Sequence, residues 1–268
     1  MDHLLAVWRD VARRLRSAEH VLLLSDYDGT LTPIVERPEL AELPPQTREV
    51  LERLVRRHNL TVGIISGRAL SDLKARLGLE GIVYAGNHGL EMEGPGLWFV
   101  NPLAEEIRPL LRLLHLALLQ ALSALRGVLV EDKGLTLSVH YRQVDSGRVA
   151  EVKSALESVV SPSRAGDRVR VTSGKKVYEV RPAVDWDKGK AIELLLEKYS
   201  QGRRTRPLPL YLGDDLTDED GFRVVNRHEG ISIFVGEEQT TSVARYCLKS
   251  PQEVQKLLGL VLELKKVE

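Results

Sequence analysis

Two carboxylates, Asp26 and Asp28, stand two residues apart, one residue beyond the apolar run Val21–Leu24. A short apolar run of this kind is typical of a buried strand, and open parallel sheets bind their ligands just beyond the carboxyl ends of the strands. At that position one carboxylate could attack an electrophile while the other handles a proton, and the two together could hold a divalent cation. The same residues, followed by Gly29 and Thr30, could also form a simple turn, because Asp-Gly is a common turn pair.

Polar clusters follow three further predicted strands. They are Ser66-Gly67-Arg68, Asn87-His88-Gly89 and Gly213-Asp214-Asp215, and the pair Lys188-Gly189 opens a helix before the last of them. If the strands are parallel, all of these clusters meet at one edge of the sheet. Carboxylate oxygens at this density suit a hard cation such as Mg²⁺, and a nearby lysine would help to neutralise a phosphate dianion. Each cluster alone could be a loop or a helix cap, but their order and placement together predict a phosphoryl-transfer site.

The elements that must position these clusters alternate between strand and helix in the first third of the chain. Apolar runs predict strands at 21–25, 60–65 and 81–85, with helices after Pro44-Pro45 and over 70–77. The alternation returns after residue 182, with helices near 188, over 219–225 and over 251–264 and strands at 209–212, 231–235 and 244–248. This order is typical of an α/β fold, in which helices cover both faces of a Rossmann-like parallel sheet.

The middle of the chain has a different pattern. Helices are predicted over 102–125 and 149–160, and strands at 128–133, 135–142, 169–172 and 177–180. Paired strands beside separate helices are typical of an α+β domain with an antiparallel sheet. The sequence therefore predicts a core domain of residues 1–104 and 182–268, into which an α+β cap domain of residues 105–181 is inserted.

Composition narrows the range of partners. The chain has 268 residues and a formal net charge of zero, so bulk charge indicates no nucleic-acid or membrane partner. Its one cysteine, Cys247, cannot form an intrachain disulfide, which fits a reducing, cytoplasmic compartment. Residues 4–15 have the spacing of an amphipathic helix rather than of a signal peptide. The most apolar segment, 110–125, is shorter than the ~20 residues of a membrane span.

The order of the motifs resembles that of the haloacid dehalogenase (HAD) superfamily of phosphotransferases. It runs Asp26-Tyr27-Asp28-Gly29-Thr30, then Ser66, then Lys188, then Gly213-Asp214-Asp215-Leu216-Thr217-Asp218. The insertion between Ser66 and Lys188 resembles the larger α/β (type C2) cap of that superfamily. More narrowly, Gly86-Asn87-His88-Gly89, Glu131-Asp132-Lys133 and Val139-His140-Tyr141-Arg142 are similar to segments of trehalose-6-phosphate phosphatases.

This resemblance implies a role for each core residue. Asp26 resembles the nucleophile that forms an aspartyl-phosphate, and an aspartate of this kind divides hydrolysis into two displacements. Asp28 resembles the general acid that protonates the leaving sugar oxygen and then activates water. Ser66 and Lys188 resemble the pair that holds the phosphate. The implied Mg²⁺ ligands and their close partners are Asp26, Asp28 through its backbone carbonyl, Asp214, Asp215 and Asp218.

Residues of the predicted cap would select the sugar. Alternation along 135–142 puts Thr136, Ser138, His140 and Arg142 on one face, which could bind sugar hydroxyls or could simply face solvent. The resemblance implies these substrate-binding residues: Arg68, Asn87, His88 and Gly89 in the core, and Glu131, Lys133, His140, Arg142, Lys175 and Glu179 in the cap. His88 could instead be a loop histidine that its neighbours satisfy.

The resemblance thus implies a Mg²⁺-dependent phosphatase that hydrolyses trehalose 6-phosphate to trehalose and phosphate. The partners expected are a small sugar phosphate and, as a further possibility, a trehalose-phosphate synthase. Three alternatives stay open: a related phosphatase for sucrose phosphate or glycosyl-phosphoglycerate, a phosphomutase, and a weakly active regulatory module paired with a synthase. The presence of Asp26, Asp28, Lys188 and Asp214 disfavours the regulatory module.

Overall fold

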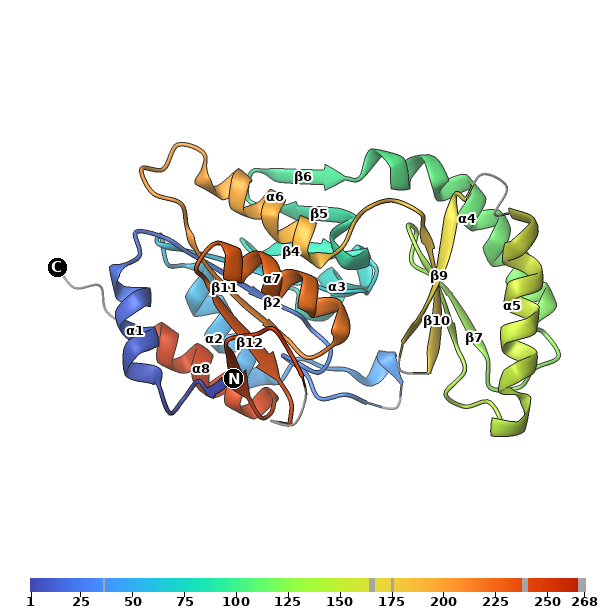
Figure 1. The fold of residues 1–268 in the computed structure, drawn as a ribbon, viewed down its shortest axis with the longest axis horizontal. Helices are drawn as coiled ribbons and strands as arrows, with labels where there is room; N and C mark the ends of the chain where they lie inside the picture. Colours follow the sequence, from blue (N-terminus) through green and yellow to red (C-terminus); the bar gives the residue numbers. More distant parts are fainter. Residues whose placement is uncertain (36, 164–166, 175, 238–240, 265–268) are drawn as a thin grey trace. The chain divides into compact units, whose positions relative to one another are not determined.

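The computed structural model describes residues 1–35, 37–163, 167–174, 176–237 and 241–264. The chain divides into two compact units, one formed by residues 1–99 and 186–268 and the other by residues 100–185 (Figure 1). The first unit contains a nine-stranded sheet and the second a four-stranded sheet. The predicted fold class, an α/β core with an inserted α+β unit, is confirmed. The predicted domain bounds lie four to five residues inside the limits of the second unit.

The sheet of the first unit has the strand order β1-β13-β12-β11-β2-β3-β4-β5-β6. In this order, the first seven strands, from β1 through β13, β12, β11, β2 and β3 to β4, each pair in parallel with their neighbours. Strand β5 pairs antiparallel with β4. The strands are β1 (Asp2–His3), β2 (Val21–Ser25), β3 (Leu60–Ile65), β4 (Val83–Gly86), β5 (Glu91–Gly94), β6 (Leu97–Val100), β11 (Leu208–Gly213), β12 (Ile231–Val235) and β13 (Tyr246–Leu248).

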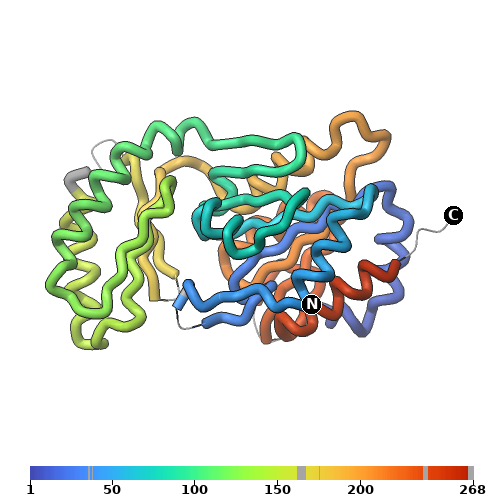
Figure 2. The backbone as a smooth tube through the Cα atoms, turned by 180° about the vertical axis from the view of Figure 1, so that it is seen from behind, coloured from blue at the N-terminus to red at the C-terminus, as the bar shows by residue number. Residues whose placement is uncertain are grey.

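Helices cover both faces of this sheet, because successive side chains of each strand point to opposite faces. Val21 and Leu23 of β2 belong to one buried cluster, and Leu22 and Leu24 belong to another. The first cluster includes α1 (Trp8–Ser17), α2 (Pro45–Val55), α3 (Leu70–Leu77) and α8 (Pro251–Glu263), and the second includes α6 (Lys188–Ser200) and α7 (Glu219–Arg227). Figure 1 shows α6 and α7 in front of the central strands, and Figure 2 brings α2 and α8 forward. A strand buried on both faces reads as the continuous apolar run seen in the sequence.

The parallel register brings three strand ends side by side. Ser25 pairs with Leu212 of β11 on one side and with Ile64 of β3 on the other. The amide of Asp26 donates to the carbonyl of Leu212 at 2.8 Å. Asp26, Ser66 and the Gly213 turn therefore leave adjacent strands at the same edge of the sheet.

The second unit is a helix pair packed on an antiparallel sheet. Its helices are α4 (Pro102–Ala121) and α5 (Val149–Ser163), and its strands, in the order β7-β8-β10-β9, are β7 (Leu129–Asp132), β8 (Leu137–His140), β9 (Val169–Gly174) and β10 (Val177–Pro182). Asn101 caps α4, since its side chain accepts the amide of Ala104 at 3.1 Å. Leu111, Leu114 and Leu118 lie on one face of α4 and are buried in the core of this unit.

Short edge elements escape the sequence pattern. Strands β1, β5 and β6 are only two to four residues long, and β5 alternates charged and apolar residues too briefly to predict a strand. Four 3₁₀ segments complete the described fold: η1 (Pro38–Leu40), η2 (Asn87–Gly89), η3 (Ser146–Arg148) and η4 (Leu216–Asp218). Within the described ranges, no helix combines the length and the apolar character that crossing a membrane requires.

Candidate active site

Lys188 is buried between two carboxylates at the edge of the sheet. Its Nζ donates to Asp26 Oδ1 at 2.9 Å and to Asp218 Oδ1 at 2.6 Å, and its side chain is 3% exposed. Helix α6 begins at this lysine because Asp187 caps it, its carboxylate accepting the amide of Lys190 at 2.9 Å. Burial lowers the pKa of Lys188, but the charges of Asp218 and Asp26 outweigh burial and raise it. The lysine is therefore a fixed cation.

Asp218 connects this lysine to the turn after β11. Its Oδ1 accepts from Lys188 and from the hydroxyl of Tyr211, and its Oδ2 accepts from the amides of Asp214 and Asp215 at 3.0 Å each. The side chain is fully buried. Because a carboxylate offers about four lone-pair sites, these donors use its hydrogen-bonding capacity.

Asp28 forms a bidentate ion pair with Arg68. Arg68 donates from Nε to Asp28 Oδ2 and from Nη2 to Asp28 Oδ1, each at 2.7 Å. A third nitrogen of the same guanidinium donates to Asp72 at 2.8 Å, and Asp72 in turn accepts from Arg76 at 2.9 Å. Burial lowers the pKa of Arg68, but hydrogen bonds and charges of Asp28 and Asp72 raise it above its usual value. Arg68 thus places a full positive charge in direct contact with the carboxylate of Asp28.

Three carboxylates of the described residues lie close enough to hold a metal ion. Asp26, Asp214 and Asp218 each offer one oxygen, and these oxygens lie within 4.8 Å of one another. Gly29 borders this group in a left-handed conformation (φ +82°), and a Cβ there would overlap the Asp214 carboxylate. Carboxylate oxygens are what a hard divalent cation prefers, and because four donors already occupy Asp218, Asp26 and Asp214 are the two carboxylates of the group that fit such an ion.

The loop after β4 is fixed against the loop after β3. The carbonyl of Ser66 accepts the amide of His88, and the carbonyl of Arg68 accepts the amide of Asn87, each at 2.8 Å. Asn87 and His88 both have positive φ values, 48° and 58°. The ring of His88 lies against Gly67, 2.8 Å from where a Cβ would stand. The predicted residues Ser66, Arg68, Asn87 and His88 are therefore brought together within the first unit.

A second polar cluster lies on the sheet of the other unit. His140 Nε2 lies 2.9 Å from Glu131 Oε2, and Lys133 Nζ lies 3.4 Å from Glu179 Oε1. The hydroxyl of Thr136 donates to the same oxygen of Glu179 at 3.3 Å. Glu131 and Glu179 both pair with Ser138 of β8, one from each side, which explains why residues far apart in the chain meet here. Of the other residues predicted for this unit, Arg142 is exposed in the turn after β8, and Lys175 lies outside the described residues.

Comparison with known proteins decides the family. The model of the trehalose-phosphatase family matches residues 24–252. The chain belongs to the trehalose-phosphatase family. It is 34% identical over 98% of its length to a probable trehalose-phosphate phosphatase D of Arabidopsis thaliana, of which it covers 72%. It is 40% identical over 85% of its length to the trehalose-phosphate phosphatase of Mycobacterium tuberculosis H37Rv, of which it covers 58%.

A solved structure agrees with this membership. The C-terminal domain of trehalose-6-phosphate phosphatase from C. albicans superposes with a TM-score of 0.80 at 26% identity, covering 96% of this chain and 97% of that one. The predicted recognition as a phosphatase of this HAD-type family is therefore confirmed. The family and the acidic cluster together indicate a divalent metal ion.

The charge balance of this family member also calls for a cation. The strand-end region holds two cationic side chains, Lys188 and Arg68, and five carboxylates, those of Asp26, Asp28, Asp214, Asp215 and Asp218. Burial, with the charges of Asp218, Asp214 and Asp28, raises the pKa of Asp26 against the lowering effect of the lysine. A phosphate dianion would add to this excess of negative charge, which a divalent cation would offset.

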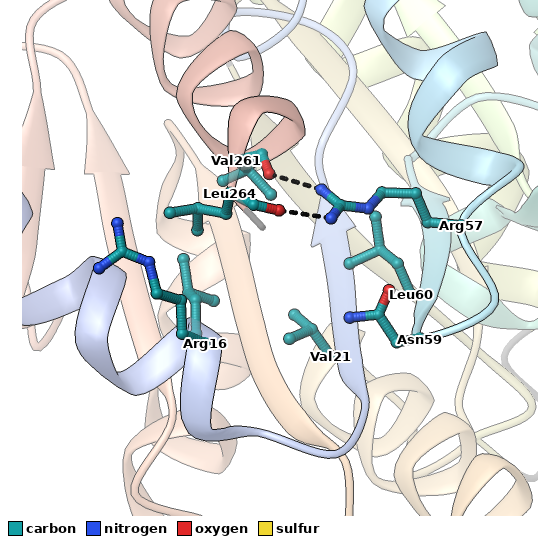
Figure 3. A pocket seen from close by; sticks show the side chains of 8 residues that line it. Arg16, Val21, Arg57, Asn59, Leu60, Val261 and Leu264 are labelled. Carbon is teal, nitrogen blue, oxygen red and sulfur yellow. Dashed lines mark hydrogen bonds between the residues drawn. The ribbon is translucent and has the colours of Figure 1, made fainter. Parts of the chain in front are cut away.

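A small pocket at the opposite end of the sheet has no part in this chemistry (Figure 3). It lies at the amino ends of β2 and β3 and has a volume of about 30 Å³. Arg57 crosses it and donates to the carbonyls of Val261 and Leu262 at 3.0 Å each and to that of Leu264. The pocket is thus the place where Arg57 caps the end of α8. Its lining residues are Leu15, Arg16, Val21, Arg57, Asn59, Leu60, Val261 and Leu264.

Sequence reasoning missed three residues that shape the family site. Asp72 and Arg76 follow Arg68 at helical spacings on α3, and that spacing was the available signal for the ion pairs. Tyr211 stands inside the buried apolar strand β11, where a hydroxyl needs a hydrogen-bond partner. Its position two residues before the Gly213 turn was the signal that could have linked it to the site.

Proposed function

We propose that this chain is a Mg²⁺-dependent phosphatase that hydrolyses trehalose 6-phosphate to trehalose and phosphate. The observation that carries the proposal is the buried Lys188, held between Asp26 and Asp218 at the carboxyl ends of the parallel strands. This arrangement gives an aspartate a fixed cationic neighbour where a phosphate can approach. Membership of the trehalose-phosphatase family supports the choice of substrate.

In the proposed first step, a carboxylate oxygen of Asp26 attacks phosphorus and the bond from phosphorus to the sugar oxygen breaks. The leaving oxygen takes a proton from Asp28, and an aspartyl-phosphate remains on Asp26. In the second step Asp28 takes a proton from water as the water oxygen attacks phosphorus, which releases phosphate and regenerates Asp26. Trehalose and phosphate are the products, and both aspartates return to their starting states.

The contact between Asp28 and Arg68 adds a requirement to this scheme. Both carboxylate oxygens of Asp28 accept hydrogen bonds from Arg68, and an oxygen that carries the acid's proton toward the leaving group cannot keep its place in this bidentate contact. Asp28 must therefore give up at least one of its two hydrogen bonds to Arg68 when it acts as the acid. Asp72 holds a separate nitrogen of Arg68 and would keep the guanidinium in place during this change. We propose that the phosphate or the sugar of the substrate then takes the released donor.

Mg²⁺ is the proposed cation because carboxylates, water and a phosphate oxygen make up its usual ligand set. Asp26, Asp214 and the backbone carbonyl of Asp28 would hold it, while Asp215 and Asp218 would support the turn that carries Asp214. When bound, the ion would offset the negative charge of the phosphate and lower the pKa of the nucleophile. Asp215 fits the supporting role, since its side chain accepts the amide of Thr217 in a capping box with Asp218.

The remaining predicted residues are assigned to substrate binding. Ser66 and Lys188 would hold the phosphate, and Arg68, Asn87, His88 and Gly89 would line the same side. In the second unit the cluster of Glu131, Lys133, His140 and Glu179 offers charged hydrogen-bonding groups that suit sugar hydroxyls, which supports a role in binding the sugar. Arg142 and Lys175 stay predictions from the resemblance.

Phosphate release from trehalose 6-phosphate tests the proposal. Activity should disappear in EDTA, return with Mg²⁺ and be absent from the Asp26→Asn variant, and free trehalose should accumulate with phosphate. A variant that keeps the wild-type turnover would refute Asp26 as the nucleophile. Transfer of the phosphoryl group to another sugar hydroxyl, without free phosphate, would instead identify a phosphomutase.

A further inference from the structure

Tyr211 is a fully buried tyrosine whose hydroxyl contacts Asp218, one of the carboxylates of the candidate site. It lies in the middle of β11, between Leu210 and Leu212, and its ring packs against Phe222 of α7 with 5.6 Å between the ring centres. Gly221 allows this packing, because a Cβ there would lie 2.5 Å from the tyrosine ring. The ring is therefore fixed on its sides, and the hydroxyl has one described destination, Asp218 Oδ1.

The hydroxyl can act only as a donor at this position. Its one described partner is a carboxylate oxygen, which can only accept, so the phenol hydroxyl must donate. A neutral donor to a carboxylate forms a strong, charge-assisted hydrogen bond. Tyr211 thus adds a directional bond to Asp218 and no charge to the site.

The same oxygen of Asp218 also accepts from Lys188. Oδ1 has two described donors, the tyrosine hydroxyl and the ammonium, while Oδ2 is committed to the backbone amides after β11. The ammonium is shared in turn with Asp26. If the tyrosine hydroxyl were removed, Lys188 would be the remaining described donor to Oδ1, and the carboxylate would draw the ammonium away from Asp26.

We propose that Tyr211 is a positioning residue for phosphoryl transfer. By holding Asp218 Oδ1, its hydroxyl sets where the Lys188 ammonium stands against Asp26 and the incoming phosphate. The inference rests on the proposed function, because Lys188 has this role only if the site transfers a phosphoryl group. It also makes Asp218 a holder of the lysine and of the Asp214 turn, rather than a group that faces the substrate.

The direct test is the Tyr211→Phe variant, which keeps the ring and removes the hydroxyl. We expect kcat to fall by about tenfold, the effect of one hydrogen bond to a charged group. The fall should be the same with trehalose 6-phosphate and with p-nitrophenyl phosphate, since the lysine acts on the phosphate rather than on the sugar. An unchanged kcat with both compounds would overturn the inference.

Tyr84→Phe is the matched control. Tyr84 is also a buried tyrosine of the first unit, but its hydroxyl bonds the backbone of Leu79 at 2.6 Å and 2.9 Å, away from the acidic cluster. This variant should lose thermal stability while its kcat, measured well below the melting temperature, stays at the wild-type value. If both variants lower kcat equally, the effect of Tyr211 belongs to the core in general and the inference fails.

Two further measurements separate positioning from packing. In an Asp218→Asn background, Tyr211→Phe should change kcat by less than about twofold, because residues that act through one another are not additive. Full additivity would contradict the proposed path through Asp218. Phe222→Leu loosens the ring packing without touching the hydroxyl, so a tenfold loss of kcat there would make packing the cause. It also tests the inference if Tyr211→Phe does not fold.

The outcome for the wild type keeps the two proposals apart. If the wild type releases phosphate from neither compound, the proposed function fails. If it releases phosphate and Tyr211→Phe matches it, only the positioning role of Tyr211 fails.

Discussion

Replacing the proposed nucleophile should stabilise the protein while it abolishes activity. Asp26 is 6% exposed and lies among other carboxylates, and its pKa is raised by burial and by the charges of Asp218, Asp214 and Asp28. The Asp26→Asn variant keeps the size of the side chain and an oxygen that can accept from Lys188. It removes the charge that this environment disfavours.

The sign follows from the direction of the pKa shift. The folded chain binds the proton of Asp26 more tightly than the unfolded chain, whose aspartate pKa is about 3.9. The ionised carboxylate therefore costs stability at pH values above the raised pKa. This cost fades as the pH falls through the raised pKa and is absent below the unfolded value. The benefit of Asp26→Asn should accordingly be full at pH values above the raised pKa, shrink as the pH falls through it, and vanish in acid.

The expected gain is about 1–2 kcal/mol, within the usual range for a single stabilising substitution. For a chain of this size, each kcal/mol moves the melting temperature by roughly 2–4 °C, so a rise of about 2–8 °C is expected. Thermal unfolding at pH 7 in EDTA measures it. Adding Mg²⁺ at about 100 times its Kd should stabilise the wild type by about 2.7 kcal/mol, and Asp26→Asn by clearly less.

Asp10→Asn is the control for this experiment. Asp10 is an exposed aspartate whose contact with Arg13 is a surface ion pair at 3.2 Å. Its replacement should change stability by less than about 0.5 kcal/mol at any pH and leave the Mg²⁺ effect intact. The reasoning is refuted if Asp26→Asn is no more stable than the wild type in EDTA, or if Mg²⁺ stabilises both equally.

Three further predictions concern the sugar, the turn and the fold. Glu179→Gln should raise KM for trehalose 6-phosphate several-fold but leave the kinetics with p-nitrophenyl phosphate unchanged. Glu157 is exposed, so Glu157→Gln should alter neither. Equal kinetics for the wild type and both variants would show that Glu179 does not bind the sugar. Gly29→Ala should lower kcat by at least roughly tenfold, because the added Cβ would displace Asp214. Gly96 has a similar φ but open space around it, so Gly96→Ala should cost only about 1–2 kcal/mol of stability and leave kcat unchanged. Equal losses of activity in the two variants would contradict this. Arg57→Ala should cost about 1–2 kcal/mol by freeing the α8 carbonyls, and an unchanged melting temperature would show that the cap is dispensable.

The strand-end clusters were predictable because their physical cause is local. A buried strand between helix layers needs a continuous apolar run, so the polar residues that follow Leu24, Ile65 and Leu212 mark the ends of strands. Parallel pairing then places those ends at one edge without further information. The fold class, and the meeting of these clusters at one edge of the sheet, could therefore be inferred from the printed residues.

The partners within the site could not be inferred in the same way. The contact of Arg68 with Asp28 depends on side-chain directions that spacing alone does not fix. The hydroxyl of Tyr211 reaches Asp218 only because η4 folds back toward β11, and a Gly213 without Cβ permits that return. In the second unit, the pairing of β7 and β10 with β8 decides that Glu131 and Glu179 flank one strand.

The most direct test of the central claim compares kcat/KM for phosphate release from trehalose 6-phosphate, sucrose 6-phosphate and glucosyl-3-phosphoglycerate in the presence of Mg²⁺. The proposed function predicts a preference for trehalose 6-phosphate of at least about tenfold, which corresponds to about 1.4 kcal/mol of transition-state binding. Equal or lower efficiency with trehalose 6-phosphate than with either alternative would contradict the claim.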